Sequence, residues 1–288
     1  MAYSRLASPS ATLSVLDARG LSTRKSLGQH FLVDDNIVGR ILALADLDSS
    51  TSVLEIGPGI GTLTVALCGL AAHVVAVERD ERLGPQLTSI AEECGNLSLI
   101  VADAVSVDME ALAGPGGPPS TLVANLPYGV AATVVLRYFQ ELASLESATI
   151  MVQAEVASRM IAVPGTKDYG SYSVKLQLLA RPAGRFAVPR SCFMPPPRVD
   201  SSVVRLERVA RSEAPEIIMA ASKTANAAFA QRRKTLRNSL RSSLALPEGA
   251  LEPALCAADI DGLRRAETLS VEEFLILGAE LHRQGLLP

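Results

Sequence analysis

The sequence predicts an α/β fold with a mostly parallel sheet, followed by a small all-helical C-terminal domain. Two observations predict it. Short apolar segments alternate with helical segments from Thr51 to about residue 152, and no strand-like segment separates the helical patterns after Arg211. Apolar strands that alternate with helices are typical of βαβ units, in which helices cover both faces of a parallel sheet. The length of 288 residues allows one large domain and one small one.

Five apolar segments are expected to form the strands of this sheet. They span residues 51–56, 73–77, 97–102, 121–124 and 148–152. Helical patterns follow the first two strands, one ending at Leu70 and one running from Asp80 to Cys94. A segment of Gly and Pro at residues 114–119 is expected to be a loop.

The two ends of the chain differ from this alternating region. Residues 1–22 are rich in Ser and Ala and are expected to be a partly disordered extension. Asp34 and Asp35 are then candidate caps of a helix that ends near Ala45. Toward the C-terminus, three helices are expected, at residues 214–230, 232–244 and 270–283. These patterns place one domain at residues 23–210 and a helical domain at residues 211–288.

Composition excludes several classes of protein. No run of about 18 apolar residues exists, so no membrane-spanning helix is expected. Charged residues interrupt the N-terminal segment, which therefore does not match a signal peptide. The sequence has no CxxC pair and only three scattered His, so no metal site is expected. We expect a cytoplasmic protein with reduced thiols.

A glycine-rich turn, Gly57-Pro-Gly59-Ile-Gly61, follows the first strand. Glycines allow the backbone to approach a ligand closely, and the following helix offers free N–H donors. The spacing is GxGxG after Glu55, whereas dinucleotide sites have GxGxxG. The turn resembles the first motif of class I methyltransferases that use S-adenosylmethionine. Taken alone, it leaves open a nicotinamide or flavin site, or a tight structural turn.

Two acidic residues end the next two strands, Glu78 and Asp103. A carboxylate at the first position can accept hydrogen bonds from ribose hydroxyls. Asp103 could accept one from the adenine amine of the cofactor. Each residue alone could instead cap a helix. Their register with the glycine turn, at the ends of consecutive strands, favours a nucleoside site.

The fourth strand ends in Asn125-Leu126-Pro127-Tyr128. This motif resembles that of methyltransferases that act on exocyclic amines of bases. The side-chain oxygen of Asn125 and a backbone carbonyl of Leu126 or Pro127 could accept hydrogen bonds from the amine and so favour charge on its nitrogen in the transition state. Tyr128 could stack on a base taken out of its helix. An ordinary strand-to-turn segment is the alternative.

Three more motifs occur, at Lys25–Leu32, Cys192–Ser201 and Phe229–Leu240. With the glycine turn and Asn125–Tyr128, they resemble the KsgA/RsmA family of small-subunit rRNA adenine dimethyltransferases. The resemblance runs from about Thr23 to the C-terminus. It implies a Rossmann-like methyltransferase domain that transfers four methyl groups from S-adenosylmethionine to N6 of two adjacent adenosines. These lie near the 3′ end of 16S rRNA in an assembling 30S subunit.

The resemblance also assigns residues to the site. The cofactor-binding residues that it implies are His30, Leu32, Gly57, Gly59, Gly61, Glu78, Asp103 and Asn125. The target adenine would meet Asn125, Leu126, Pro127 and Tyr128. Phe193 would form the other wall of the target pocket, with core packing as its alternative.

Charge is distributed unevenly along the chain. The net charge is −3, yet residues 181–241 contain 13 basic and 4 acidic side chains. The residues expected to contact rRNA phosphates are Arg232, Arg233, Lys234, Arg237 and Arg241. In one continuous helix, Arg233, Arg237 and Arg241 would share a face. A solvated helix face is the alternative, but no acidic residue lies between positions 217 and 247 to pair with them. Lys25 is a further, weaker candidate.

Three functions remain open from the sequence. The first is the 16S rRNA dimethyltransferase, acting as a monomer on a large particle. The second is an Erm-like methyltransferase of 23S rRNA, against which the Gln231–Leu240 motif argues. The third is a ribosome-assembly factor in which RNA binding matters more than catalysis.

Overall fold

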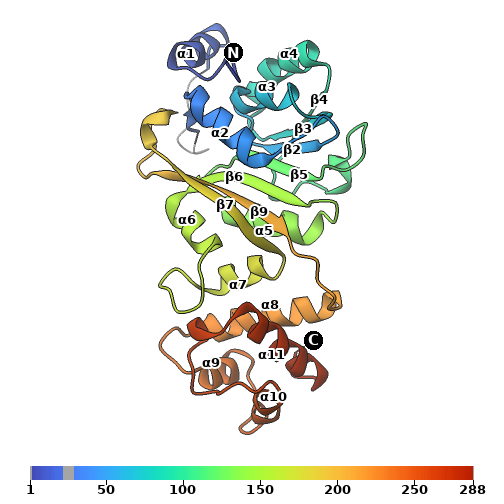
Figure 1. Ribbon diagram of the computed structural model, residues 1–288, viewed down its shortest axis with the longest axis vertical. Coiled ribbons are helices and arrows are strands. Elements are labelled where there is room, and N and C mark those ends of the chain that lie inside the picture. Colours follow the sequence, from blue (N-terminus) through green and yellow to red (C-terminus); the bar gives the residue numbers. More distant parts are fainter. Residues whose placement is uncertain (1, 22–28, 288) are drawn as a thin grey trace. The chain divides into compact units, whose positions relative to one another are not determined.

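The computed structural model describes residues 2–21 and 29–287. The chain divides into two compact units, which we call the first and the second unit. The first consists of residues 1–157 and 182–208, and the second of residues 158–181 and 209–288. Figure 1 shows the elements of each. The division differs from the predicted boundary because residues 158–181 belong with the C-terminal helices.

The first unit is built on a sheet that has seven strands among the described residues, in the order β4-β3-β2-β5-β6-β9-β7. Strands β2 to β6 pair in parallel, as the alternation of strands and helices predicts, and β9 is antiparallel to β6. The strands are β2 (Ser52–Ile56), β3 (His73–Glu78), β4 (Leu97–Val101), β5 (Thr121–Asn125), β6 (Ser147–Gln153), β7 (Ala180–Val188) and β9 (Ser201–Arg208).

Burial explains why the central strands are almost continuously apolar. All six residues of β3 are buried, whereas β4 at the edge of the sheet has none that is fully buried. A central parallel strand is covered on both faces and therefore needs apolar side chains at every position. One apolar cluster of this sheet includes Val53, Val74 and Val123 and packs against α2 and α3.

Helices of the first unit follow the strands at short intervals. They are α1 (Pro9–Ala18), α2 (Asp35–Ala45), α3 (Thr62–Cys68), α4 (Gly84–Cys94), α5 (Ala131–Glu141) and α6 (Ala154–Met160), which continues into the second unit, with 3₁₀ turns at Glu81–Leu83, Glu110–Leu112 and Arg190–Cys192. Asp34 caps α2, because its carboxylate accepts the N–H groups of Asn36 and Ile37. Asp35 does not cap it and instead accepts the N–H groups of Tyr3 and Ser4.

The expectation of partial disorder at the N-terminus is wrong for residues 2–21. Helix α1 begins with Ser8 as its cap and a proline at its first position. Leu6 and Leu16 are buried in an apolar cluster with Leu83 and Leu87. The prediction rested on a composition rich in Ser and Ala, which does not show that these few apolar side chains are buried.

Two short antiparallel strands form a separate sheet that does not pair with the main one. It joins β1 (Phe31–Leu32) to β8 (Phe193–Met194), with Leu32 opposite Phe193. Two of the sequence motifs, separated by about 160 residues, therefore lie side by side. This pairing brings residues 29–32 to the functional site described below.

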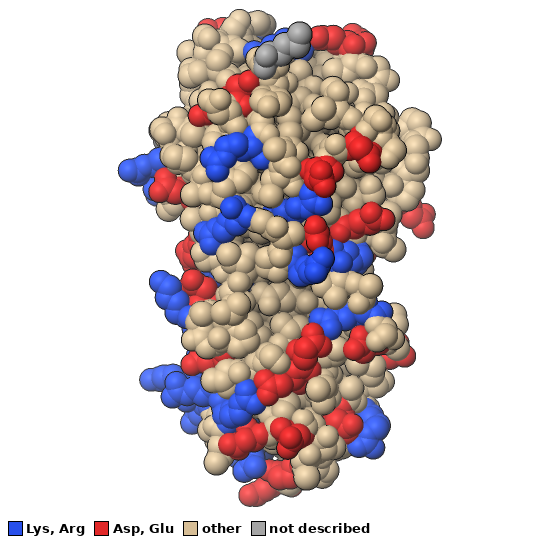
Figure 2. Space-filling view, viewed as in Figure 1, with Lys and Arg blue, Asp and Glu red and all other residues tan. Residues whose placement is uncertain are grey.

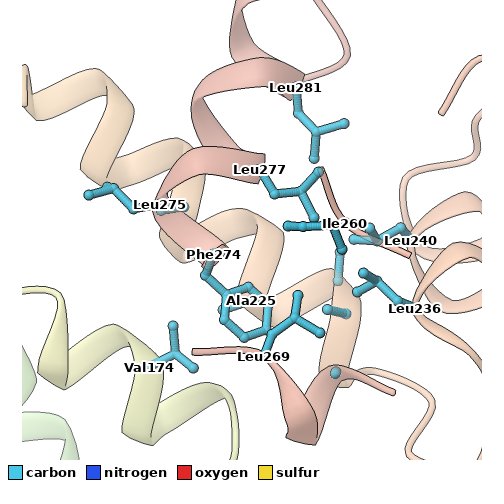
Figure 3. Close-up of a cluster of buried hydrophobic side chains, with 14 of the residues drawn as sticks. Val174, Ala225, Leu236, Leu240, Ile260, Leu269, Phe274, Leu275, Leu277 and Leu281 are labelled. Carbon is cyan, nitrogen blue, oxygen red and sulfur yellow. The ribbon is translucent and has the colours of Figure 1, made fainter. Parts of the chain in front are cut away.

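The second unit is helical. Its elements are α7 (Ser171–Gln177), α8 (Pro215–Phe229), α9 (Leu236–Ser243), α10 (Glu252–Ala257), a 3₁₀ turn at Ala266–Thr268 and α11 (Val271–Arg283). Figure 3 shows its core, in which Phe274 of α11 lies next to Ala225 of α8 and Leu277 of α11 lies next to Ile260. Val174 of α7 is fully buried in the same cluster, which explains why residues 158–181 belong to this unit.

Helix α9 is shorter than the predicted helix of residues 232–244. Thr235 caps it, and its side chain accepts the N–H of Asn238 at 3.4 Å. Residues before Thr235 form a turn. The prediction that Arg233 shares a helix face with Arg237 and Arg241 is therefore wrong. Leu236 and Leu240 are fully buried, as their spacing indicates. No helix within residues 2–21 and 29–287 is long and apolar enough to cross a membrane.

Candidate functional site

A cavity of about 390 Å³ lies in the first unit, where β2, β3 and β5 end. Parallel strands bring their carboxyl ends to one edge of a sheet, so residues that are distant in the sequence meet there. The predicted residues among those that line the cavity are His30, Leu32, Gly57, Gly59, Glu78, Asp103, Asn125, Leu126, Pro127 and Tyr128. Gly61, Phe193 and the predicted RNA-binding residues from Arg232 to Arg241 are not among the described residues that line it, and Lys25 lies outside the described residues.

The glycine turn serves two different purposes. Gly59 has φ of 62°, and its N–H donates to Glu78 Oε2 at 3.1 Å, which ties the turn to the next strand. Gly61 has φ of 92°, and a side chain there would overlap Ile90. Its N–H donates to the Pro58 carbonyl at 2.9 Å. Gly61 therefore permits helix packing, and it is not among the residues that line the cavity.

Glu78 and Asp103 both face the cavity. Glu78 is 8% exposed, and this burial raises the pKa of its carboxyl. Its oxygens accept the N–H groups of Gly59 and Asp80, which fix its orientation. Asp103 accepts the N–H of Val105 at 3.0 Å and forms an ion pair with Arg79 at 3.2 Å.

Arg79 also lines the cavity and was not predicted as a site residue. Its side chain is 65% exposed, so water screens this ion pair and the pair contributes little to stability. A charged residue after a strand is common, and the sequence offered no signal for its contact with Asp103.

Glu55 is a further residue that the sequence did not assign to the site. It is 1% exposed and lines the cavity, and its Oε2 has no hydrogen-bond partner among the described residues. Burial, together with the nearby charge of Glu78, raises the pKa of Glu55 to about 8. A buried carboxyl oxygen without a partner is costly, and a cationic ligand group would remove that cost.

These features test whether S-adenosylmethionine fits the cavity. Glu55 offers an acceptor for the ammonium of its methionine part, and Glu78 and Asp103 offer acceptors for ribose and adenine. Gly57 leaves room against the Pro127 ring, because a Cβ there would lie 3.3 Å from Pro127 Cδ. The residues present therefore fit this cofactor.

Asn125 ends β5 at the centre of the site. Its Nδ2 donates to the His30 carbonyl at 3.2 Å, which leaves Oδ1 as an acceptor. The Pro127 carbonyl accepts the N–H of Val130 at 3.2 Å. The Leu126 carbonyl accepts no backbone N–H among the described residues, so it is the better second acceptor of the two predicted.

The rings of His30 and Tyr128 face each other in the cavity. The centroids of His30 and Tyr128 lie 5.8 Å apart with an interplanar angle of 26°. His30 Nδ1 contacts the Pro195 carbonyl at 2.7 Å, and the Tyr128 hydroxyl lies 2.5 Å from that of Ser201. Burial raises the pKa of Tyr128, so its hydroxyl remains protonated.

Phe193 does not form a wall of this cavity. Its side chain is 3% exposed and packs in the apolar cluster of Leu32, Ile37 and Val38. The β1–β8 pairing places it opposite Leu32, and this burial favours the alternative interpretation of core packing. Lys25 lies outside the described residues.

The predicted RNA-binding residues lie in the second unit and are not equivalent. Arg233, Lys234 and Arg241 are exposed and form no ion pair within the described part of the chain. Arg237 instead pairs with Glu252 of α10 at 3.2 Å. Arg232 donates to the Lys167 carbonyl at 3.3 Å. On the face shown in Figure 2, basic and acidic side chains are interspersed, so basic character is local.

Comparisons with known proteins show the family to which the chain belongs. The family described as "Ribosomal RNA adenine dimethylase" matches residues 20–282. A "Ribosomal RNA small subunit methyltransferase A" from Pelotomaculum thermopropionicum is 44% identical, over 93% of this chain and 95% of the relative.

Two solved structures resemble most of the chain. The dimethyladenosine transferase of Plasmodium falciparum has a TM-score of 0.71 and 25% identity, covering 89% of this chain and 98% of that one. The 23S rRNA methyltransferase ErmE has a TM-score of 0.64 and 28% identity, covering 88% and 99%.

Proposed function

This chain belongs to the ribosomal RNA adenine dimethylase family, and we propose that it transfers methyl groups from S-adenosylmethionine to N6 of two adjacent adenosines near the 3′ end of 16S rRNA. The observation that carries the proposal is the orientation of the Asn125 amide. Since its Nδ2 binds the His30 carbonyl, its Oδ1 is left to accept a hydrogen bond from an exocyclic amine.

The amine of adenine is a weak nucleophile because its lone pair is delocalised into the ring. Hydrogen bonds from its N–H groups to Asn125 Oδ1 and the Leu126 carbonyl stabilise the positive charge that develops on N6. When bound, S-adenosylmethionine supplies the electrophilic methyl group. The methylated amine is acidic and releases its proton to water, so the site needs no strong general base.

The remaining cavity residues bind the methyl donor. Glu55 accepts from its ammonium group, Glu78 from the ribose hydroxyls and Asp103 from the adenine amine. The backbone of Gly57 and Gly59 lies against the methionine part. His30 and Leu32 cover the same cavity from the β1 side.

The partner in this proposal is 16S rRNA within the assembling 30S subunit. Arg232, Arg233, Lys234 and Arg241 contact its phosphates, with Arg237 released from Glu252 on binding. The enzyme acts in the cytoplasm. We expect it to act as a monomer, because its binding partner is a large particle.

Tritiated S-adenosylmethionine tests the proposal with three substrates: immature 30S particles, 50S particles and naked rRNA. Label should appear in 30S particles, at two adjacent dimethylated adenosines located by mass spectrometry. Asn125→Ala protein is the matched control for background label. Label in 50S particles alone, or in none of the three substrates, would overturn the proposal.

A 23S rRNA target is the second candidate, because the fold of ErmE covers nearly all of this chain. The higher identity with a small-subunit relative favours 16S rRNA. The 50S arm of the same assay decides between them.

A further inference from the structure

The N-terminal segment precedes the part of the chain that matches the family, residues 20–282, yet it is anchored at several points. We call residues 3–18 the N-terminal brace. The N–H groups of its first two residues donate to the Asp35 carboxylate of α2 at 3.0 and 2.8 Å. Its Arg5 forms an ion pair with Glu93 of α4. The brace therefore joins α2 to α4.

Helix α1, which forms most of the brace, is buried on one face only. Thr12 and Leu16 lie one turn apart and are buried, whereas Leu13 is 51% exposed. Leu6, which lies just before the helix, is also buried. A helix of this kind is stabilised mainly by the surface against which its apolar face packs. The neighbours of Leu6 and Leu16 therefore indicate what the brace does.

Those neighbours include a wall of the cavity. Leu6 and Leu16 share an apolar cluster with Phe31 of β1 and Ile60 of the glycine turn, which are both buried. Phe31 lines the cavity. Its ring lies against Gly59, where an added Cβ would come within 3.1 Å of Phe31 Cε1. The brace and this wall of the cavity therefore belong to one packed cluster.

Strand β1 needs such support because it is short. It has two residues and, among the described residues, pairs with β8 alone, which is also two residues long. A two-stranded pair is at best marginally stable by itself in water. The position of Phe31, and with it that of the neighbouring cavity residues His30 and Leu32, therefore depends on the side chains packed around it.

We propose that the N-terminal brace holds Phe31 against Gly59 and so keeps the methyl-donor cavity in the shape that binds S-adenosylmethionine. The inference goes beyond the proposed function, because it concerns the binding of the methyl donor and not the RNA target. No residue of the brace lines the cavity, so Leu6 and Leu16 are positioning residues.

Weaker packing of the brace should lower the affinity for the methyl donor and preserve the maximal rate. Apparent affinity falls with the fraction of molecules that are competent to bind, so a competent fraction of about one tenth raises the Kd about tenfold. Saturating S-adenosylmethionine draws the population back to the competent state. The kcat at saturation should therefore stay near that of wild type.

Leu16→Ala in the full chain tests the brace. Calorimetry should give a Kd for S-adenosylmethionine about tenfold above that of wild type, whereas kcat at saturating cofactor stays within about twofold. Leu16→Met nearly conserves volume and should restore the wild-type Kd. Should Leu16→Ala not fold, Leu16→Val removes less volume and should raise the Kd about threefold. Leu13→Ala is the matched control on the exposed face of the same helix and should leave the Kd unchanged.

A second control separates positioning from loss of stability. Leu145→Ala truncates a fully buried side chain just before β6, whereas the cavity lies where the parallel strands end. Both Ala variants should lower the free energy of unfolding in urea, because each leaves a cavity in the core. Only Leu16→Ala should raise the Kd of S-adenosylmethionine. Equal Kd values for these two variants, or a wild-type Kd in Leu16→Ala, would overturn the brace.

Hydrogen exchange in the absence of cofactor gives a readout that involves no binding. The N–H of Val33 donates to the Cys192 carbonyl at 2.9 Å, next to the β1–β8 pair. Amides of residues 31–33 should exchange faster in Leu16→Ala than in wild type, and Leu145→Ala should leave them unchanged. Unchanged exchange at residues 31–33 in Leu16→Ala would contradict the brace. A wild-type chain that methylates no rRNA would contradict only the proposed function.

Discussion

Asn125 obtains its direction from a single backbone carbonyl. An amide can present either its oxygen or its nitrogen, and only the oxygen accepts a hydrogen bond from an amine. The His30 carbonyl binds Nδ2 at 3.2 Å and settles that choice. At the scale of single residues, the site therefore depends on contacts between segments that the sequence keeps far apart.

Asn125→Ala should abolish most methylation without affecting substrate binding. The Ala side chain removes an acceptor that stabilises charge in the transition state, and loss of one such group costs about 10²–10³-fold in rate. Single-turnover methylation and sedimentation with 30S particles measure the two effects separately. Affinity for 30S particles should stay within about twofold. A parallel loss of rate and affinity would argue that Asn125 holds the particle.

Glu55 gives the first unit a dependence of stability on pH. Its folded-state pKa of about 8 lies above the ordinary value of 4.5 because of burial and the charge of Glu78. The stability from the neutral carboxyl is therefore complete below about pH 4.5 and is lost as pH rises to about 8.

Glu55→Gln should remove this pH dependence. The free energy of unfolding of Gln protein minus that of wild type should grow between pH 5 and 8, by on the order of 4 kcal/mol at most. Urea denaturation at several pH values measures the difference. S-adenosylmethionine should also lose affinity for the variant and release fewer protons on binding, as calorimetry in two buffers reports. A constant difference across pH would contradict the assignment.

At the scale of elements, the turn before α9 differs from the helix itself. Arg233 and Lys234 lie in the turn and form no ion pair among the described residues, whereas Arg237 on α9 pairs with Glu252. A cation that already has a carboxylate partner gains less from a phosphate. The basic residues should therefore contribute unequally to RNA binding.

Arg233→Gln with Lys234→Gln should weaken 30S binding and reduce the slope of log affinity against log salt. Each lost phosphate contact reduces that slope by about 0.7. Filter binding between about 50 and 200 mM salt measures this slope. Arg237→Gln is the matched control and should change the slope less. Glu252→Gln, which frees Arg237, should strengthen binding. Equal effects at all positions would refute the distinction.

At the scale of the whole molecule, the chain crosses between its units more than once. Tyr169, Val174 and Leu178 lie in the middle of the sequence, yet they are buried with α8 and α11 in the second unit. A sequence-based boundary near residue 210 does not predict that residues 158–181 belong to the second unit. The sequence of a short helical segment does not show which other helices it packs against.

Truncation after Arg208 should therefore give a poorly soluble protein, because it exposes the apolar side chains of residues 158–181. Replacing residues 158–181 in that fragment with a flexible Gly/Ser linker of about 15 residues should restore a soluble protein that binds S-adenosylmethionine. Size-exclusion chromatography and calorimetry measure both properties. A well-behaved fragment without the replacement would contradict the observed division.

The fold and much of the site could be predicted because each depends on local patterns. Burial on both faces makes β3 apolar at every position, and this run is visible in the sequence. Glu78 and Asn125 each end a parallel strand, so the topology itself brings them to one edge. Gly61 and Phe193 belong to the motifs but do not line the cavity, since motifs do not tell which way a residue faces.

The sequence by itself determined the α/β class, the five parallel strands and the group of residues at their carboxyl ends. Only the tertiary structure decided that Glu55 Oε2 has no partner among the described residues, that the ring next to Tyr128 is His30, and that residues 158–181 join the helical unit. The reason is physical. Periodicity and turn residues reflect what each segment needs locally, whereas His30 and Pro195 meet across 165 positions, through packing of the whole chain.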